Sequence, residues 1–132
     1  MRKCICILTS AHPIDDVRVY RKIALSLIEH FDVIWIGPDT YFFEKALDSD
    51  GILRILVNQK RGTLGRLYTN LWVIRKYRQL TRRIDFVYFP DPDLAFLFTH
   101  LVQSRHIKKI FDIHEVFHLG LLNRRVKGVL YL

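Results

Sequence analysis

The sequence predicts a doubly wound α/β fold, in which helices cover both faces of a mainly parallel sheet. Three observations lead to this fold class. Short, nearly continuous apolar runs, typical of strands buried on both faces, alternate with longer segments of helical periodicity. Two of these runs end abruptly in acidic and histidine residues, as expected at the edge of a parallel sheet where ligands bind. The chain has 132 residues, which suits one domain with its own core.

The first expected strand, Ile5–Thr9, is an apolar run that follows a short basic lead. Cys4 and Cys6 are two residues apart, so on a strand both point to one face, where we expect small buried apolar side chains. Residues 10–16 form a polar loop. A helix then begins with Asp16 as its N-cap, because apolar residues recur on one face at helical spacing. These residues are Val17, Tyr20, Ala24, Leu27 and Ile28.

A second strand, 32–36, is closed by Gly37-Pro38, a pair typical of turns. We expect 39–51 to be a loop with one helical turn around 42–47, followed by a third strand at 52–57. From there on, helices and strands alternate, as in a parallel sheet with crossover helices. The remaining elements are a helix at 64–83, a strand at 85–89, a helix at 93–104 and a strand at 107–113.

The net charge of +8 is concentrated in one segment. Residues 52–84 contain nine Lys or Arg and no acid, which gives +9 there, against −2 for 1–51 and +1 for 85–132. No apolar stretch reaches the roughly 20 residues that span a bilayer, and no secretory cleavage site follows the first apolar run. The cysteines and histidines do not have zinc-site spacing. We therefore expect a cytoplasmic protein without a bound metal.

Polar residues directly follow two of the expected strands. Phe86–Phe89 runs into Pro90-Asp91-Pro92-Asp93, and Ile110-Phe111 runs into Asp112-Ile113-His114-Glu115. A histidine can exchange hydrogen bonds with a hydroxyl group near neutral pH, and an adjacent carboxylate can set its tautomer. The strand ends therefore predict a site, although each has a structural alternative. His114 could simply cap a strand or helix end, and Asp93 could be the N-cap of a helix beginning at Leu94, with Asp91 favouring the turn.

Three segments together resemble the N-terminal domain of family 4 glycosyltransferases. These are retaining nucleotide-sugar enzymes of GT-B architecture, in which two Rossmann-like domains face a cleft. The order and spacing agree over essentially the whole chain, whereas Pro90 stands where many relatives have histidine and Tyr88 departs likewise. The segments are 5–18 with Ser10-x-His12-Pro13 and Asp16-x-Arg18, 87–94 with Asp91-Pro92-Asp93-Leu94, and 110–115 with Asp112-x-His114-Glu115.

The resemblance implies the acceptor-side half of a glycosyltransferase for surface glycan, glycolipid or polysaccharide synthesis. His114 matches a position near the transferring sugar and is the expected catalytic residue. The expected donor is a nucleotide sugar with no separate cofactor, and the expected acceptor is a glycan or a lipid-linked glycan. A donor-binding domain lies outside these residues, so we expect activity to require a further domain or a separate subunit. The expected cleft or substrate-binding residues are His12, Asp16, Arg18, Asp91, Asp93, Asp112 and Glu115.

Arg18 is the hardest of these residues to explain structurally. It lies one or two positions inside the expected helix, where the helix dipole disfavours a cation. An anionic ligand such as a donor phosphate would account for an arginine at this place. Asp16, in contrast, has both a capping and a ligand-binding interpretation.

The basic segment predicts a membrane-binding surface. In the helix at 64–83 the stripe Val73, Tyr77, Leu80 and Ile84 is expected to pack on the sheet. A second group, Leu64, Leu67, Tyr68 and Leu71, lies on the opposite side in line with arginines, a combination suited to an anionic membrane interface. We therefore expect peripheral association with the inner face of the membrane. The expected membrane-binding residues are Arg66, Tyr68, Trp72, Arg75, Arg78 and Arg82.

Other interpretations remain open at the sequence level. The basic helix could be kinked and buried on both faces with a solvated basic rim. The whole chain could be a membrane-recruiting or scaffold domain without turnover. A nucleic-acid-binding domain is a weaker alternative, because no recognised nucleic-acid motif accompanies the charge, and we expect no nucleic-acid partner.

Overall fold

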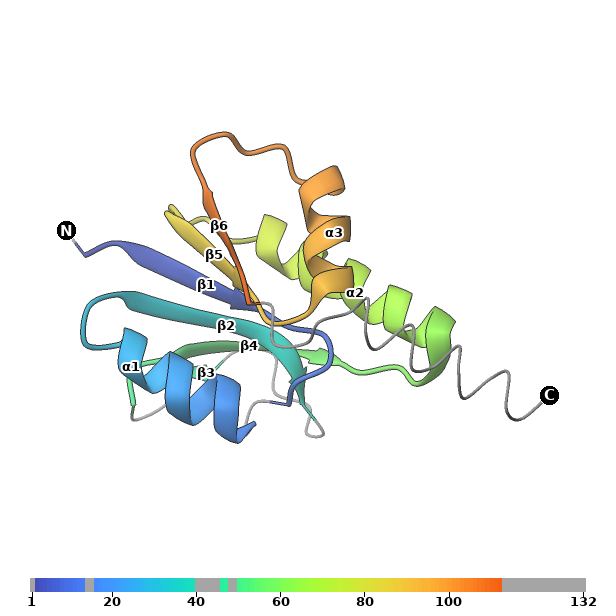
Figure 1. The fold of residues 1–132 in the computed structure, drawn as a ribbon, viewed down its shortest axis with the longest axis horizontal. Coiled ribbons are helices and arrows are strands. Elements are labelled where there is room, and N and C mark those ends of the chain that lie inside the picture. The colour runs from blue at the N-terminus through green and yellow to red at the C-terminus, as the bar shows by residue number, and fades with distance from the viewer. Residues whose placement is uncertain (1, 14–15, 40–45, 48–49, 113–132) are drawn as a thin grey trace, which may run out of the picture.

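The computed structural model describes residues 2–13, 16–39, 46–47 and 50–112. Within these residues a six-stranded sheet has the order β3-β4-β2-β1-β5-β6. The pairs β4-β2, β2-β1, β1-β5 and β5-β6 are parallel, and only the short β3 runs antiparallel to its neighbour (Figure 1). The predicted α/β, Rossmann-like fold class is confirmed. The strands are β1 Cys4–Leu8, β2 Asp32–Asp39, β3 Ala46–Leu47, β4 Leu53–Asn58, β5 Phe86–Phe89 and β6 Lys108–Phe111.

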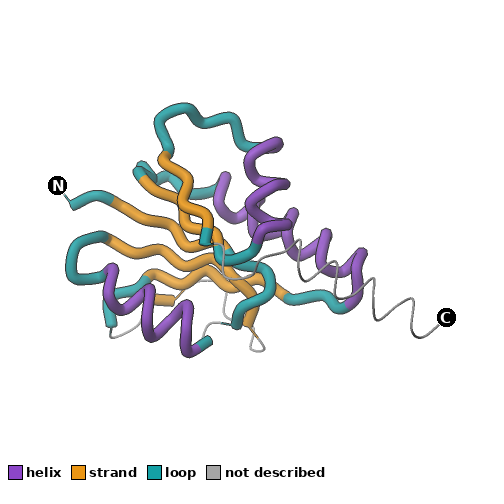
Figure 2. The backbone as a smooth tube through the Cα atoms, viewed as in Figure 1, coloured by secondary structure: helices purple, strands orange, loops and turns teal. Residues whose placement is uncertain are grey.

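Helices cover both faces of the sheet (Figure 2). Side chains of β1 alternate between the two cores: Cys4 and Cys6 pack in the core beneath α2 and α3, and Ile5 and Ile7 in the core beneath η1 and α1. This burial on both faces explains the continuously apolar strand. Both cysteines are free and buried as predicted, and burial raises the pKa of Cys4 to about 11. The helices are η1 Val17–Ala24, α1 Leu25–Leu27, α2 Gly62–Arg78 and α3 Pro92–Leu101.

The first helix begins where the sequence predicts. Oδ1 of Asp16 accepts hydrogen bonds from the backbone N–H groups of Arg18 at 3.0 Å and Val19 at 2.9 Å, as an N-cap does. The expected buried face was wrong at Val17, which is 59% exposed, whereas Val19 is fully buried. The reason is that residues 17–24 form a π-helix, whose wider turn changes which side chains face the sheet.

The second strand and the loop after it also differ from expectation. Strand β2 continues through Gly37-Pro38 to Asp39, because its parallel pairing with β4 extends from Ile34↔Leu53 to Asp39↔Asn58. In the expected loop, Ala46–Leu47 is strand β3 and pairs with β4, so a helical turn there was wrong at these two positions. The rest of that expected turn, 42–45, lies outside the described residues.

Helix α2 ends five residues before the expected position. The backbone N–H of Gln79 closes the last turn on the carbonyls of Arg75 and Lys76, and the chain then leaves the helix for β5. Leu80 and Ile84 still pack in the predicted core, but from the connecting loop. As a result, Arg82 is not on the helix, and the expected row of arginines loses this member.

Helix α3 begins at Pro92, earlier than expected, with Asp91 at the N-cap position. Proline is favoured at the first helical position, because its missing N–H would have no partner in the helix. Asp93 is therefore inside the first turn, and the capping interpretation of Asp93 was wrong. None of the described helices is both long and apolar enough to cross a bilayer.

Gly37 allows a close approach between β2 and the end of β1. A Cβ atom at this position would lie 2.7 Å from Thr9 Cγ2 and 2.7 Å from Trp35 Nε1. Because both neighbours are buried, we expect Gly37→Ala to lower the free energy of unfolding by about 1–3 kcal/mol, measured by urea denaturation. Gly51→Ala is a comparison variant, because a Cβ atom at Gly51 would meet no other atom. Any loss of stability in Gly51→Ala would come from the backbone φ of +83° and not from close packing. Unchanged stability of Gly37→Ala would contradict the close packing.

Candidate functional site

The carboxyl edge of the sheet, where β1, β2, β4, β5 and β6 end, is organised around Asp91. This residue is only 2% exposed. Its Oδ2 accepts hydrogen bonds from the Thr9 hydroxyl at 2.7 Å, the Ser10 backbone N–H at 2.7 Å and the Ala11 backbone N–H at 3.3 Å. Because β1 and β5 are parallel neighbours, their carboxyl ends meet at this edge. Asp91 thus ties the loop after β1 to the end of β5.

His12 lies between two carboxylates of the same edge. Its Nδ1 is 3.2 Å from Asp16 Oδ2, and its Nε2 is 3.4 Å from Asp91 Oδ1. The His12 backbone N–H donates to the Thr9 hydroxyl oxygen at 3.0 Å, so backbone and ring are both fixed. Burial acts to raise the pKa of Asp16, but hydrogen bonds from Val19, His12 and Arg18 outweigh it and lower that pKa.

A third carboxylate, Asp93, joins α3 to α2. Arg66 donates to it through Nε at 2.7 Å and Nη2 at 2.9 Å, and Asn70 Nδ2 donates at 3.1 Å. The hydrogen bond to Asp93 raises the pKa of Arg66. Burial acts to raise the pKa of Asp93, but the hydrogen bonds from Arg66 and Asn70 outweigh it and lower that pKa. Arg66 Nη2 is also 3.9 Å from Asp91 Oδ1, so this arginine belongs to the carboxyl edge.

A third group of polar side chains lies toward η1. The Tyr88 hydroxyl donates a hydrogen bond to Asp112 Oδ2. Burial and the bond to Asp112 raise the pKa of Tyr88, and the positive charge of Arg18 acts in the opposite direction. Arg18 Nε and the Ser10 hydroxyl are buried atoms without a hydrogen-bond partner in the described structure.

The lowered pKa values of Asp16 and Asp93 give a prediction for acid stability. A carboxyl whose pKa is lower in the folded protein stabilises it above the unfolded value of 3.8, and this contribution is lost as pH falls through the folded pKa. At pH values below about 4, we expect the midpoint of urea denaturation to decrease as the pH is lowered. This decrease should be less steep in Asp93→Asn than in the unchanged protein. Identical pH profiles for both proteins would contradict the role of Asp93.

The structure brings together most of the residues that the sequence predicts for the site. His12, Asp16 and Asp91 form one contact group, and Asp93 is linked to it through Arg66. Asp112 accepts a hydrogen bond from Tyr88 at the neighbouring strand ends, and Arg18 is the second residue of η1. His114 and Glu115 lie outside the described residues. Among the residues that the structure describes, no group of histidine, cysteine and acidic side chains could hold a metal ion.

Sequence reasoning did not predict Thr9 and Asn70 as parts of this edge. Thr9 could have been suspected, because it is the first polar residue after an apolar strand that pairs with the strand before Asp91. In the sequence, Tyr88 stands out only as a departure from the pattern of family 4 glycosyltransferases. The contact of Asn70 with Asp93 could not be predicted from the sequence, because a single asparagine on a helix has many structural explanations.

The expected membrane surface is exposed but less basic than predicted. Leu64 is 82% exposed, and Leu67, Tyr68, Leu71 and Trp72 are exposed with it, which excludes a helix buried on both faces. Three of the expected arginines have internal partners. Arg66 binds Asp93, Arg78 donates to the Leu101 carbonyl oxygen, and Arg82 binds Asp32 at the opposite edge of the sheet. Arg75 lies over the Trp72 ring at 5.6 Å.

No protein-family model, curated protein or solved structure matches this chain.

Proposed function

We propose that this chain is the acceptor-side domain of a retaining nucleotide-sugar glycosyltransferase that builds a surface glycan or glycolipid in the cytoplasm. The observation that carries the proposal is the buried Asp91, which ties the loop after β1 to the end of β5. This link holds the polar residues of two strand ends at one edge of a parallel sheet, the edge at which ligands bind in such folds. The resemblance to family 4 glycosyltransferases rests on the same segments.

In this proposal the carboxyl edge forms one wall of a cleft. His12 is held between Asp16 and Asp91, so its ring has a fixed orientation from which to exchange hydrogen bonds with sugar hydroxyl groups. His114 is proposed to lie near the transferring sugar, as the resemblance implies. The second wall, with the donor-binding residues, would come from a further domain or a separate subunit.

Release of nucleoside diphosphate tests this function. The chain is mixed with a panel of nucleotide sugars, a lipid-linked glycan acceptor and candidate donor-binding domains. We expect release with at least one donor, loss of most of that activity in His114→Ala, and normal activity in His106→Ala, a matched change at an exposed loop position. No release with any donor and any candidate domain would contradict the proposal, as would full activity of His114→Ala.

We further propose that the outer face of α2 holds the enzyme on an anionic membrane. The face is formed by Leu64, Leu67, Leu71, Tyr68 and Trp72, all exposed. Tryptophan and tyrosine with leucine suit the interface, and Arg75 beside Trp72 adds a cation there. This is the arrangement expected for reversible binding to a surface of acidic lipids.

Arg75→Glu tests the membrane proposal. Each cation near an anionic bilayer contributes about 1 kcal/mol, so a charge reversal is expected to weaken vesicle binding about tenfold or more. The measurement is co-sedimentation with vesicles that contain acidic lipid, and neutral vesicles should bind little of the protein. Arg105→Glu makes the same charge change at an exposed position after α3 and should bind normally. Equal binding of both variants would rule out α2 as the membrane-binding face.

A membrane-recruiting domain without turnover is the second candidate function. The exposed apolar face of α2 supports this candidate as well as it supports a membrane-bound transferase, because membrane binding by that face requires no catalytic residue. Vesicle binding that depends on Arg75, together with no nucleoside diphosphate release, would favour this candidate over the transferase.

A further inference from the structure

Strand β6 is the last strand on one side of the sheet and exposes apolar side chains there. In the part of the chain that the structure describes, β6 pairs with β5 and with no other strand (Figure 1). Ile110 is 40% exposed and Phe111 is 50% exposed, and as adjacent strand residues they point to opposite faces of the sheet. A strand with an unpaired side and exposed apolar side chains is a template for pairing with a further strand.

The backbone groups of β6 that point away from β5 belong to Lys109 and Phe111. The backbone N–H groups of residues 108 and 112 donate to the carbonyl oxygens of residues 85 and 89, both at 3.0 Å. Because successive residues of a strand direct their backbone groups to opposite neighbours, positions 108, 110 and 112 are bonded towards β5. The N–H and C=O groups of Lys109 and Phe111 therefore point outward, where an added strand can bond to them.

The two lysines of β6 do not shield this side of the strand. Lysine is common on edge strands, where its charge opposes pairing with a further strand. Here Lys108 Nζ lies 5.9 Å from the centre of the Phe86 ring, and Lys109 Nζ lies 5.9 Å from the centre of the Phe98 ring. Both ammonium groups are thus turned towards β5 and α3 of the same molecule. A further strand can approach β6 without burying either charge.

We infer that β6 pairs antiparallel with β6 of a second copy of this chain, around a two-fold axis that passes beside Ile110. An axis perpendicular to the sheet keeps equivalent faces of the two copies on one side, so residues that face each other must lie on the same face. In this register Ile110 lies opposite Ile110 of the second copy, and Lys109 lies opposite Phe111 of the second copy. The residues with outward backbone groups thus bond to each other, and no lysine lies opposite a lysine. This self-complementarity favours a second copy over a different protein.

This pairing leaves the candidate site and the outer face of α2 accessible. The paired strands run in opposite directions, so the carboxyl edges of the two copies lie at opposite ends of the joined strands. The perpendicular axis places α2 of both copies on the same face of the continuous sheet. The inference goes beyond the proposed function and does not rest on it, because dimer formation can be measured without sugar transfer and without a membrane.

Sedimentation equilibrium of the full chain measures the dimer. The contact is short, and small interfaces bind weakly, so we expect mostly monomer at about 10 μM and mostly dimer at about 1 mM. Ile110→Lys places two ammonium groups beside the axis and should weaken the dimer about tenfold or more. Leu64→Lys makes the same kind of change at an 82% exposed position of α2 and should dimerise like the unchanged protein.

A disulfide cross-link tests the register directly. The Cα atoms of two opposite residues in a non-hydrogen-bonded antiparallel pair are about 4.5 Å apart, a distance that a disulfide can span. Ile110→Cys should therefore form a covalent dimer under mild oxidation. Lys108→Cys changes an exposed residue on the same face of β6, but its equivalents lie several residues apart in this register, so it should stay largely uncoupled. Cys4 and Cys6 are buried, so the unchanged protein should not cross-link.

Several results would overturn the inference. The unchanged protein could stay monomeric at about 1 mM, a result that does not depend on whether a variant folds. In such a monomer, a new thiol in Ile110→Cys that does not react with maleimide would mean that the chain itself covers β6, and a reactive one would leave β6 to a different protein. A dimer lost in Leu64→Lys but kept in Ile110→Lys would place the contact on α2, and equal cross-linking of Lys108→Cys and Ile110→Cys would reject the register. Dimer formation without nucleoside diphosphate release would retain this inference and reject only the transferase.

Discussion

Asp91→Asn is expected to lower the free energy of unfolding by about 3 kcal/mol, because it places an amide where a buried carboxylate accepts several hydrogen bonds. Thr9 Oγ1 and the Ser10 backbone N–H each donate to this carboxylate at 2.7 Å, with almost no access of water. The amide can accept at one atom only, and its NH₂ group would face donors or lose its own partners. Urea denaturation at neutral pH measures the change.

Asp93→Asn is the matched control for Asp91→Asn. It makes the same chemical change two residues away, but Asp93 is exposed and pairs with an arginine that is only partly buried. Exposed ion pairs contribute little, so we expect a loss below about 1 kcal/mol at neutral pH. Equal losses in the two variants would show that Asp91 does not organise the carboxyl edge.

Arg54→Met is expected to cost about 2 kcal/mol, because it disrupts a polar network that joins η1 to β4. Both Nη atoms of Arg54 donate to Asp50, at 3.2 Å and 3.0 Å, and the Tyr20 hydroxyl donates to Asp50 as well. The bond to Asp50 raises the pKa of Tyr20. The Arg54 guanidinium also lies 4.9 Å from the centre of the Tyr20 ring, a cation–π contact that methionine cannot make.

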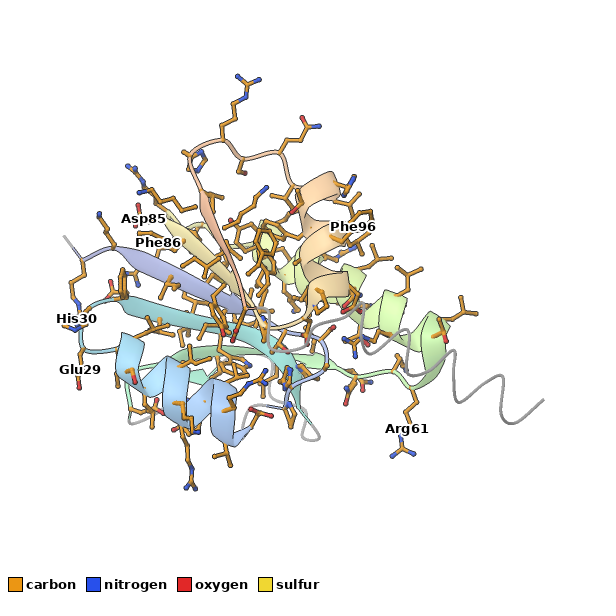
Figure 3. The ribbon with its side chains drawn as sticks, in the orientation of Figure 1. Glu29, His30, Arg61, Asp85, Phe86 and Phe96 are labelled. Atoms are coloured by element: carbon orange, nitrogen blue, oxygen red, sulfur yellow. The ribbon has the colours of Figure 1, made fainter. Side chains whose placement is uncertain are left out.

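Arg61→Met controls for the loss of a positive charge alone. Arg61 is exposed and projects away from the fold (Figure 3), so its replacement should change stability by no more than about 0.5 kcal/mol in the same urea experiment. If Arg54→Met were as stable as the unchanged protein, the network would not be what fixes η1 on the sheet.

The strands could be predicted closely from the sequence because their burial on both faces leaves a direct signal in composition. The helix boundaries were harder. Asp16 has a capping signature that is local, and its prediction is confirmed. The end of α2 is set by the path to β5, and periodicity continues into Leu80 and Ile84 although the helix has ended. A π-helix has no recognisable sequence pattern, so Val17 was placed on the wrong face.

The candidate site residues could be proposed from the sequence, but the residues that they contact could not. Asp91 and Asp93 are two residues apart, yet one is buried against β1 and the other forms an ion pair with α2. Nothing local distinguishes them, because the difference lies in which element packs beside each. For the same reason Arg66 was assigned to a membrane surface, whereas its guanidinium binds Asp93. The roles of His114 and Glu115 stay predictions.

Mapping nucleotide-sugar binding by backbone amide NMR tests the central claim, that the carboxyl edge is the wall of a sugar-transfer site. The full chain is titrated with a panel of nucleotide sugars, alone and with a soluble glycan acceptor. We predict shifts confined to the carboxyl edge, in residues 9–12, 16–18, 88–91 and 112. Shifts at the opposite edge, where Glu29, His30 and Asp85 lie (Figure 3), or no shifts with any donor and acceptor, would contradict the account.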